Sequence, residues 1–260
     1  MNSVNKTLYI PLYGKAYVSR RGLFLKDKKA EEIWEKEQFP LKGKSRSKWL
    51  AFYMGIRAAA FDDWVRAQME ANPDAAVIHL GCGMDSRAVR VGTEGHSWYD
   101  VDFPDVIQER KRYFEESAGY HMIPSDVRDS AWLAHIPEKK AIVVMEGISM
   151  YLTAGELRGL TELLSSHFDR LVCLMDCYTV MAAKLSKYKN PINDVGVTEV
   201  YGMDDPMLLQ SGDFSFVREH PMTPARYIDR LHGAEKVIFR KLYAGSFSKK
   251  LYRLFEYRKG

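Results

Sequence analysis

The feature that most constrains this chain is an apolar run that breaks into a glycine turn at residues 77–87 (Val-Ile-His-Leu-Gly-Cys-Gly-Met-Asp-Ser-Arg). The run has the length of a buried strand, and the polar stretch after the turn is compatible with a helix. Because glycine has no side chain, a strand–glycine–helix junction lets a ligand approach the bare backbone. The junction therefore predicts a nucleotide-like ligand at this point of an α/β fold.

Strand and helix patterns alternate from residue 75 onwards. Strands are expected over 75–80, 97–102, 120–124, 141–145 and 171–176, with two more over 214–220 and 251–257. Helices are expected over 104–117 and 224–231, and Thr153 and Glu156 have the spacing of a capping box that begins a third. This alternation predicts a mostly parallel seven-stranded sheet, built from right-handed crossovers and covered by helices on both faces.

The length of 260 residues fits one large α/β domain with elaborations. Apolar residues at steps of three or four predict a long helix that ends near Asn72 and Pro73. We therefore expect an N-terminal helical cap or lid over residues 1–72 and a core over 73–260. A polar, irregular stretch at about 177–212 is expected to form an insertion over the carboxyl edge of the sheet, where ligands bind in such folds.

The composition excludes several classes of protein. With 46% hydrophobic and 28% charged residues, the chain is typical of globular proteins. No apolar stretch is long enough to span a bilayer, and the first residues do not have the pattern of a signal peptide. The three cysteines have no zinc-like spacing, so we expect no metal site and a reducing, cytoplasmic location.

The basic residues are concentrated near the N-terminus, where residues 1–50 contain 12 Lys or Arg and 5 Asp or Glu. Such a segment could attract nucleic acid, an anionic membrane or an acidic substrate. It contains no nucleic-acid motif and no stacking pattern of aromatic residues. We therefore favour a solvated lid, and we expect neither nucleic acid nor a membrane as a partner.

The glycine turn is a poor match for a dinucleotide. A dinucleotide fingerprint requires a third glycine, and Ser86 occupies that position. Asp85 also lies where a pyrophosphate would approach the helix start, and its charge would repel the phosphates. S-adenosyl-L-methionine fits better, because it has no phosphates, carries a positive sulfonium and presents an ammonium group. A nicotinamide-dependent dehydrogenase is a less favoured alternative.

Besides Asp85 after the first expected strand, acidic residues follow the next three strands and support the same ligand. Asp102 lies 21 residues after Gly81 at the end of the second expected strand, where an acid binds the hydroxyls of an adenosine ribose. A helix cap is the alternative role for Asp102. Asp126 could accept a hydrogen bond from the adenine amino group, and Glu146 with Gly147 would face the same crevice. Carboxylates crowded at one sheet edge repel one another, and a ligand with hydroxyls, an amine and a positive charge would relieve this repulsion.

Four stretches together resemble a known family, namely residues 80–87, 98–106, 125–129 and 146–152. They are similar to the leucine carboxyl methyltransferase family, and more closely to its branch of polyketide-synthesis O-methyltransferases. Residues 7–16 and 201–206 are also similar to that branch. The resemblance therefore covers nearly the whole chain.

The resemblance implies a class I methyltransferase (Rossmann-like) fold with an antiparallel last strand. It also implies S-adenosyl-L-methionine as methyl donor, with S-adenosyl-L-homocysteine as product. In the family a basic pair holds the cofactor carboxylate, and Arg57 and Lys15 are the matching residues, whereas Asp126 and Val127 flank the adenine. The expected cofactor-binding residues are Lys15, Arg57, Gly81, Cys82, Gly83, Asp85, Asp102, Phe103, Asp126, Val127, Glu146 and Gly147.

The methyl acceptor is less constrained by the sequence. A carboxylate needs no base, whereas a phenol with a pKa of about 10 benefits from one. No histidine lies in a motif, so no catalytic base is predicted, and Tyr151 and Tyr201 are candidates for the acceptor pocket. We expect an O-methyltransferase acting on a carboxyl or phenolic hydroxyl of a small molecule. A protein C-terminal carboxyl methyltransferase and a non-catalytic S-adenosylmethionine-binding module remain alternatives, and the oligomeric state is not predicted.

Overall fold

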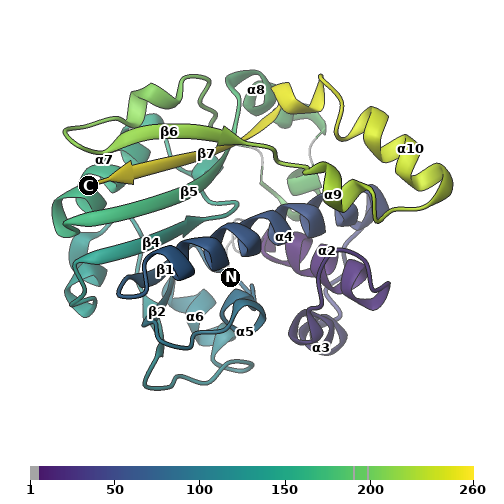
Figure 1. Cartoon of the computed structure of the whole chain (residues 1–260). Coiled ribbons are helices and arrows are strands. Elements are labelled where there is room, and N and C mark those ends of the chain that lie inside the picture. The colour runs from purple at the N-terminus through teal and green to yellow at the C-terminus, as the bar shows by residue number, and fades with distance from the viewer. Residues whose placement is uncertain (1–5, 190, 198) are drawn as a thin grey trace.

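A seven-stranded sheet runs through the structure, a computed structural model that describes residues 6–189, 191–197 and 199–260 (Figure 1). The strands are β1 (Ala76–Leu80), β2 (Trp98–Asp102), β3 (Tyr120–Pro124), β4 (Lys140–Met145), β5 (Arg170–Tyr178), β6 (Ser215–His220) and β7 (Tyr252–Lys259). Their order in the sheet is β3-β2-β1-β4-β5-β7-β6. The seven expected strands are thus present, each within a few residues of its predicted bounds.

The first five strands pair in parallel, and β7 pairs antiparallel with both β5 and β6. The expected antiparallel last strand is therefore confirmed. In the register of the sheet, His79 of β1 is opposite Asp100 of β2 and Val144 of β4. Because β1, β2, β4 and β5 run in one direction, their carboxyl ends meet at the same edge, and the residues that follow them lie close together.

Helices surround the sheet (Figure 1). The α-helices are α2 (Tyr9–Arg20), α3 (Lys28–Glu37), α4 (Lys48–Ala71), α5 (Arg87–Val91), α6 (Pro104–Arg110), α7 (Ala154–His167), α8 (Val180–Lys189), α9 (Ala225–Ile228) and α10 (Gly233–Leu242). The 3-10 helices are η1 (Gly43–Arg46), η2 (Ser130–His135), η3 (Ser149–Tyr151), η4 (Pro191–Val195), η5 (Pro206–Leu209) and η6 (Ser248–Lys250). The expected capping box is present at α7, where Thr153 and Glu156 exchange side-chain and backbone hydrogen bonds.

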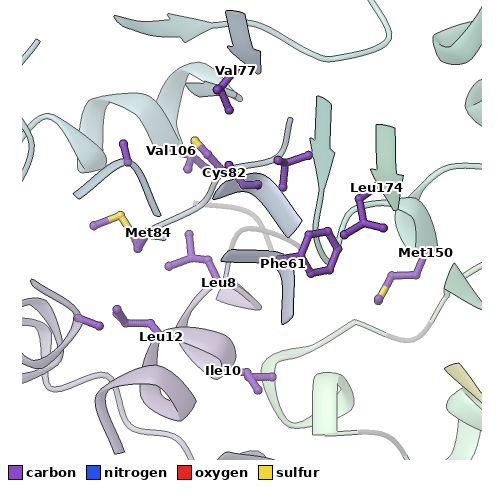
Figure 2. Close-up of a cluster of buried hydrophobic side chains, with 14 of the residues drawn as sticks. Leu8, Ile10, Leu12, Phe61, Val77, Cys82, Met84, Val106, Met150 and Leu174 are labelled. Atoms are coloured by element: carbon purple, nitrogen blue, oxygen red, sulfur yellow. The ribbon is translucent and has the colours of Figure 1, made fainter. Parts of the chain in front are cut away.

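Two hydrophobic cores cover the two faces of the sheet, because neighbouring residues of a strand point to opposite faces. Val77 belongs to the first core, with Phe61 of α4 and Val106 of α6, and Figure 2 shows these side chains together. Ile78 belongs to the second core, which includes Leu157 of α7. The sheet is therefore buried on both sides, as a parallel sheet requires.

The N-terminal helices α2 and α4 cross at close range, because glycines lie at the contact. A Cβ atom on Gly14 would lie 2.7 Å from Cβ of Met54, and one on Gly55 would lie 2.6 Å from Cγ2 of Val18. Helices from the C-terminal part also pack here, since the ring of Phe239 in α10 lies 6.2 Å from that of Phe52. The domain boundary near residue 72 stays a prediction.

Three sequence expectations differ from the structure. The helix predicted over 104–117 ends at Arg110, whose buried side chain binds Asp100 and the carbonyl oxygen of Gly83. Strand β5 continues to Tyr178, because β7 pairs along its full length, and the first residues of the expected irregular insertion form α8. Helix α10 was not predicted, and the pattern over 224–231 yields only the short helix α9.

Candidate active site

The glycine turn follows β1 and lines a pocket at the carboxyl edge of the sheet. The backbone has positive φ angles at Gly81 (+65°) and Gly83 (+51°), which other residues rarely adopt. A Cβ atom on Gly81 would lie 2.7 Å from Cδ1 of Ile148, and one on Gly83 would lie 3.4 Å from Cβ of Leu8. The backbone conformation thus favours glycine at both positions, and Gly81 also has no space for a side chain.

Asp102 ends β2 directly beside this turn. One oxygen of its carboxylate accepts a hydrogen bond from the backbone N–H of Gly83 at 2.7 Å, and the other accepts one from the N–H of Phe103 at 2.8 Å. Burial raises the pKa of Asp102 to about 6, and the two backbone hydrogen bonds offset this only in part. The result is a carboxylate held in a fixed orientation at the pocket.

Asp85 is surrounded by cations of the chain itself. Its carboxylate lies 2.9 Å from Nζ of Lys15, 2.6 Å from Nη1 of Arg90 and 3.4 Å from Nη2 of Arg87. Burial alone would raise the pKa of Asp85, but Arg90 and Lys15 outweigh this effect and hold the pKa well below its usual range. The argument from sequence that Asp85 would repel a pyrophosphate is therefore weakened, because its charge is already neutralised.

Arg90 connects the helix after the glycine turn to the N-terminal helices. Its guanidinium lies 2.7 Å from Asp27, the N-cap residue of α3, and 2.7 Å from Asp62 in α4. All three side chains are almost completely buried. Breaking one partner of a buried pair leaves an uncompensated charge, so this network fixes α3, α4 and α5 relative to the turn.

Glu146, at the end of β4, belongs to a second buried network. Arg57 of α4 contacts Glu146 at 3.0 Å and Asp176 of β5 at 3.0 Å, and Arg87 also pairs with Glu146. Tyr252 of β7 donates a hydrogen bond to Asp176 over 2.6 Å and accepts one from Arg57 over 2.8 Å. Although burial raises the pKa of Glu146, Arg57 and Arg87 outweigh it and lower the pKa to about 2.

These networks correct one inference from the sequence. We expected the acids at the strand ends to repel one another until a ligand relieved the repulsion. In the structure, Asp100 pairs with Arg110, and Glu146 pairs with Arg57. The chain thus supplies most of the compensating charge itself, and Asp102 is the strand-end acid that relies on backbone N–H groups.

The structure brings most of the predicted site residues into one pocket of about 300 Å³. The predicted residues that line it are Lys15, Arg57, Gly81, Cys82, Gly83, Asp85, Asp102, Phe103, Glu146, Gly147 and Tyr151. They come from the N-terminal helices and from the ends of β1, β2 and β4. Figure 2 shows Leu8, Cys82 and Met84, which also line the pocket, within the first hydrophobic core.

Three predicted residues do not line this pocket. Asp126 binds the side chain of its neighbour Arg128, with Oδ1 accepting from Nε at 3.0 Å. Val127 belongs to the hydrophobic core on the other face of the sheet, and Tyr201 is exposed, with its backbone N–H bonded to the carbonyl oxygen of Met150. The predicted adenine role of Asp126 and Val127 and the acceptor role of Tyr201 receive no support from this geometry.

Several lining residues were not identified from the sequence. They are apolar or aromatic and include Tyr53, Met54, Ile148, Met150, Tyr178, Ile192 and Tyr252. The ring of Tyr252 lies 6.3 Å from that of Tyr53 and 4.8 Å from that of Tyr178. These three rings come from α4, β5 and β7, so no local spacing in the sequence could have grouped them.

Two absences concern the described residues only. Within ranges 6–189, 191–197 and 199–260, no group of three or more His, Cys, Asp or Glu is placed to hold a metal ion. Among the helices of the same ranges, none is long and apolar enough to cross a membrane.

The sheet order with its antiparallel β7, together with the glycine turn after β1 and the acid after β2, defines the fold of a class I methyltransferase. A solved structure with this arrangement is magnesium protoporphyrin IX methyltransferase from Synechocystis PCC 6803 with bound SAH. It superposes with a TM-score of 0.52 at 14% identity, over 88% of this chain and 93% of that one.

Sequence comparison identifies the family. Residues 7–165 match the leucine carboxyl methyltransferase family. The tetracenomycin polyketide synthesis O-methyltransferase TcmP of Streptomyces glaucescens is 31% identical over 217 residues, which cover 81% of this chain and 79% of that protein. The S-adenosyl-L-methionine-dependent methyltransferase dpfgK of Gibberella zeae is 32% identical over 184 residues, which cover 65% of this chain and 62% of that protein.

The chain belongs to the leucine carboxyl methyltransferase family and is an S-adenosyl-L-methionine-dependent methyltransferase. This assignment excludes the nicotinamide-dependent dehydrogenase that was considered from the sequence.

Proposed function

We propose that the protein transfers the methyl group to a carboxylate or phenolic oxygen of a small-molecule acceptor. The observation that carries this proposal is the apolar and aromatic lining of the pocket beside the glycine turn, to which Tyr53, Tyr151 and Tyr178 contribute. Pockets for small molecules are typically apolar with a few placed polar groups. The name of the relative TcmP, an O-methyltransferase, supports oxygen as the accepting atom.

The residues at the glycine turn fit the cofactor. The carboxylate of Asp102 is oriented by two backbone N–H groups, and ribose hydroxyls could donate to its remaining lone pairs. Lys15 and Arg57 both line the pocket and could hold the cofactor carboxylate. S-adenosyl-L-methionine, when bound, supplies an electrophilic methyl group on a positively charged sulfur.

The ionisation of the site favours a carboxylate over a phenol. A phenol needs a group that accepts its proton near neutral pH, whereas a carboxylate arrives ionised. Arg57 and Arg87 lower the pKa of Glu146 to about 2 despite its burial, which makes Glu146 a weak base. The carboxylate of Asp102, whose pKa burial raises to about 6, is a stronger base, but this proposal assigns it to the ribose hydroxyls of the cofactor. Burial raises the pKa of Tyr151 and of Tyr252, so both phenols stay neutral. The residues of this site can therefore orient the acceptor and exclude water, which is most of what an in-line methyl transfer requires.

The size of the pocket favours a small molecule over a protein terminus. The pocket of about 300 Å³ also has to hold the cofactor, so the space that remains for the acceptor is small. It is bounded by Leu8 and Pro11 at the N-terminal segment and by Ile192 in η4. A peptide tail would need a cleft that continues past these residues.

The test is methyl uptake from labelled S-adenosyl-L-methionine into three panels, namely carboxylic acids, phenols and peptides with a free C-terminus. Alkaline treatment of the product separates the two oxygen chemistries, because an ester releases the label and an aryl ether does not. A base-labile product from a small acid is expected. Uptake into peptides alone would overturn the proposal, and cofactor binding without uptake in any panel would favour the non-catalytic module.

A further inference from the structure

Helix α10 presents an apolar face to solvent. Val237 is 54% exposed and Leu242 is 65% exposed, and Ala234 and Ile238 are also exposed, with the charged Lys241 on the same side. These positions repeat at steps of three and four, so they lie on one side of the helix. The opposite side carries Phe239, which is completely buried against the N-terminal helices. The exposed side is therefore a second apolar face rather than the core-facing one.

The same kind of surface continues from α10 towards α8. Phe247, which follows α10, is 61% exposed. The next turn is η6, where the carbonyl oxygen of Lys250 accepts a hydrogen bond from Oγ1 of Thr179, immediately before α8. On α8, Met181 and Leu185 are exposed as well. We use the name apolar-basic surface for the exposed apolar residues of α8, of α10 and of the turn between α10 and β7, together with the exposed lysines beside them. Figure 1 shows where these elements lie in the molecule.

Basic residues accompany these apolar residues. The sequence over 180–189 contains three lysines and no acid, and that over 233–250 contains five basic residues and one acid, Glu235. Glu235 is held by Arg21 and Lys48, while Lys236 and Arg240 pair with Asp229. Among the described side chains, Lys184, Lys241 and Lys250 are exposed beside these aliphatic and aromatic residues, so this part of the surface carries positive charge.

We propose that the apolar-basic surface docks the enzyme on an anionic membrane, with α10 lying in the interface. A helix with an apolar face and lysines beside it is typical of segments that bind lipid surfaces without spanning them. A second copy of this chain is disfavoured, because self-pairing would bring lysines against lysines. Nucleic acid is disfavoured, because exposed leucine, valine and methionine gain little from phosphates.

The N-terminal basic residues do not compete for this role. Arg20 pairs with Glu35, and Lys28 pairs with Glu31, so much of that charge is balanced locally. The element after α8 in the described chain is η4, whose Ile192 lines the pocket. Docking would therefore place one wall of the pocket near the lipid surface. This proposal departs from the expectation from sequence that no membrane is a partner, and the vesicle experiment below decides between the two.

The test is co-sedimentation of the full chain with phosphatidylcholine vesicles, with and without phosphatidylglycerol. Binding to the anionic vesicles alone is expected, and it should weaken as salt rises. Leu242→Ser combined with Phe247→Ser should lose at least about tenfold in vesicle affinity. Lys241→Gln and Lys250→Gln should each lose roughly fivefold. The matched control is Val89→Ser on α5, which should leave the vesicle affinity unchanged. Val89 is 62% exposed, but it lies outside this surface.

Four outcomes would overturn the proposal. They are no vesicle binding, equal binding to neutral and anionic vesicles, unchanged binding by the serine variant, and self-association that the serine substitutions abolish in the absence of lipid. Vesicle binding is measured without acceptor or cofactor, so its failure is distinguishable from failure of the proposed O-methylation.

Discussion

The backbone N–H of Gly83 donates a hydrogen bond to Oδ2 of Asp102 over 2.7 Å, and this contact joins the glycine turn to the end of β2. It combines two sequence signals that lie far apart along the chain. The N–H of Gly83 orients the carboxylate of Asp102, and this carboxylate is the hydrogen-bond acceptor for that N–H. A change at either residue therefore disturbs the other. Asp102 is accordingly the position where substitution is most informative about the cofactor.

Asp102→Ala should abolish the stabilisation of the protein by S-adenosyl-L-homocysteine. A ligand at 100 times its dissociation constant stabilises the folded state by roughly 2.7 kcal/mol. For a chain of this length, that corresponds to a rise of several degrees in Tm. Thermal melts with and without ligand measure the effect, and Asp213→Ala, an exposed acid outside the pocket, is the control. An undiminished shift in Asp102→Ala would remove Asp102 from the ribose role.

Cofactor affinity should increase as pH rises through about 6. Burial raises the pKa of Asp102 to about 6, and hydroxyl donors bind its ionised form. Titrations of S-adenosyl-L-homocysteine between about pH 5 and about pH 7 should show this trend, and Asp102→Asn should flatten it. The neighbouring acids Asp85 and Glu146 have lowered pKa values and stay ionised across this window. A trend that persists in Asp102→Asn would assign the titration to another group.

The same pKa has a consequence for stability, with a defined sign. The folded-state pKa of Asp102 lies above the value of about 4 in an unfolded chain. The stabilisation of the folded state that results from this raised pKa is therefore fully present below about pH 4 and is lost as pH rises through about 6. In the absence of ligand, Asp102→Asn does not titrate, so its Tm relative to the parent protein should rise between about pH 4 and about pH 7. The amide NH2 group meets one of the two backbone N–H donors, which lowers the Tm of the variant at both pH values and leaves this trend unchanged. The opposite trend would contradict the raised pKa.

Gly81→Ala should destabilise the protein and weaken cofactor binding. A positive φ costs about 1–2 kcal/mol for a residue with a Cβ atom, and the new atom would also lie 2.7 Å from Ile148. Gly159→Ala in α7 is a matched control, because its added Cβ atom meets nothing within 4 Å. That substitution should instead stabilise the helix by about 1 kcal/mol. Urea unfolding of both variants provides the comparison.

Arg57→Met should cost about 3–5 kcal/mol of unfolding free energy, because it leaves Glu146 and Asp176 buried without their shared cation. Arg158→Met removes an exposed pair with Glu162 and should change stability by about 0.5 kcal/mol at most. Chemical unfolding at neutral pH measures both. Similar losses in the two variants would show that the buried network contributes no more than a surface pair.

The sequence was most informative where local patterns and global fold agree. The apolar runs at β1, β4 and β5 predicted buried parallel strands, because both faces of those strands are covered. Residues after the carboxyl ends of β1, β2 and β4 were correctly expected at one edge, since this follows from parallel pairing alone.

The sequence was least informative where partners come from distant segments. Arg57 of α4 meets Glu146, which follows β4, as well as Asp176 of β5 and Tyr252 of β7, and no spacing rule connects these residues. The charge state of Asp85 likewise depends on Lys15 and Arg90, which only the folded structure brings together. Acids counted along a sequence therefore overstate the repulsion that remains after folding.

The position of β7 between β5 and β6 has a consequence for biosynthesis. Tyr252, at the start of β7, belongs to the pocket wall, and its hydroxyl is bonded to Arg57 and Asp176. A nascent chain that has reached only residue 250 therefore contains the whole glycine turn but still has a gap in its sheet and an incomplete buried network. Methyl transfer should accordingly begin only after the strand at residues 252–259 has been translated and inserted.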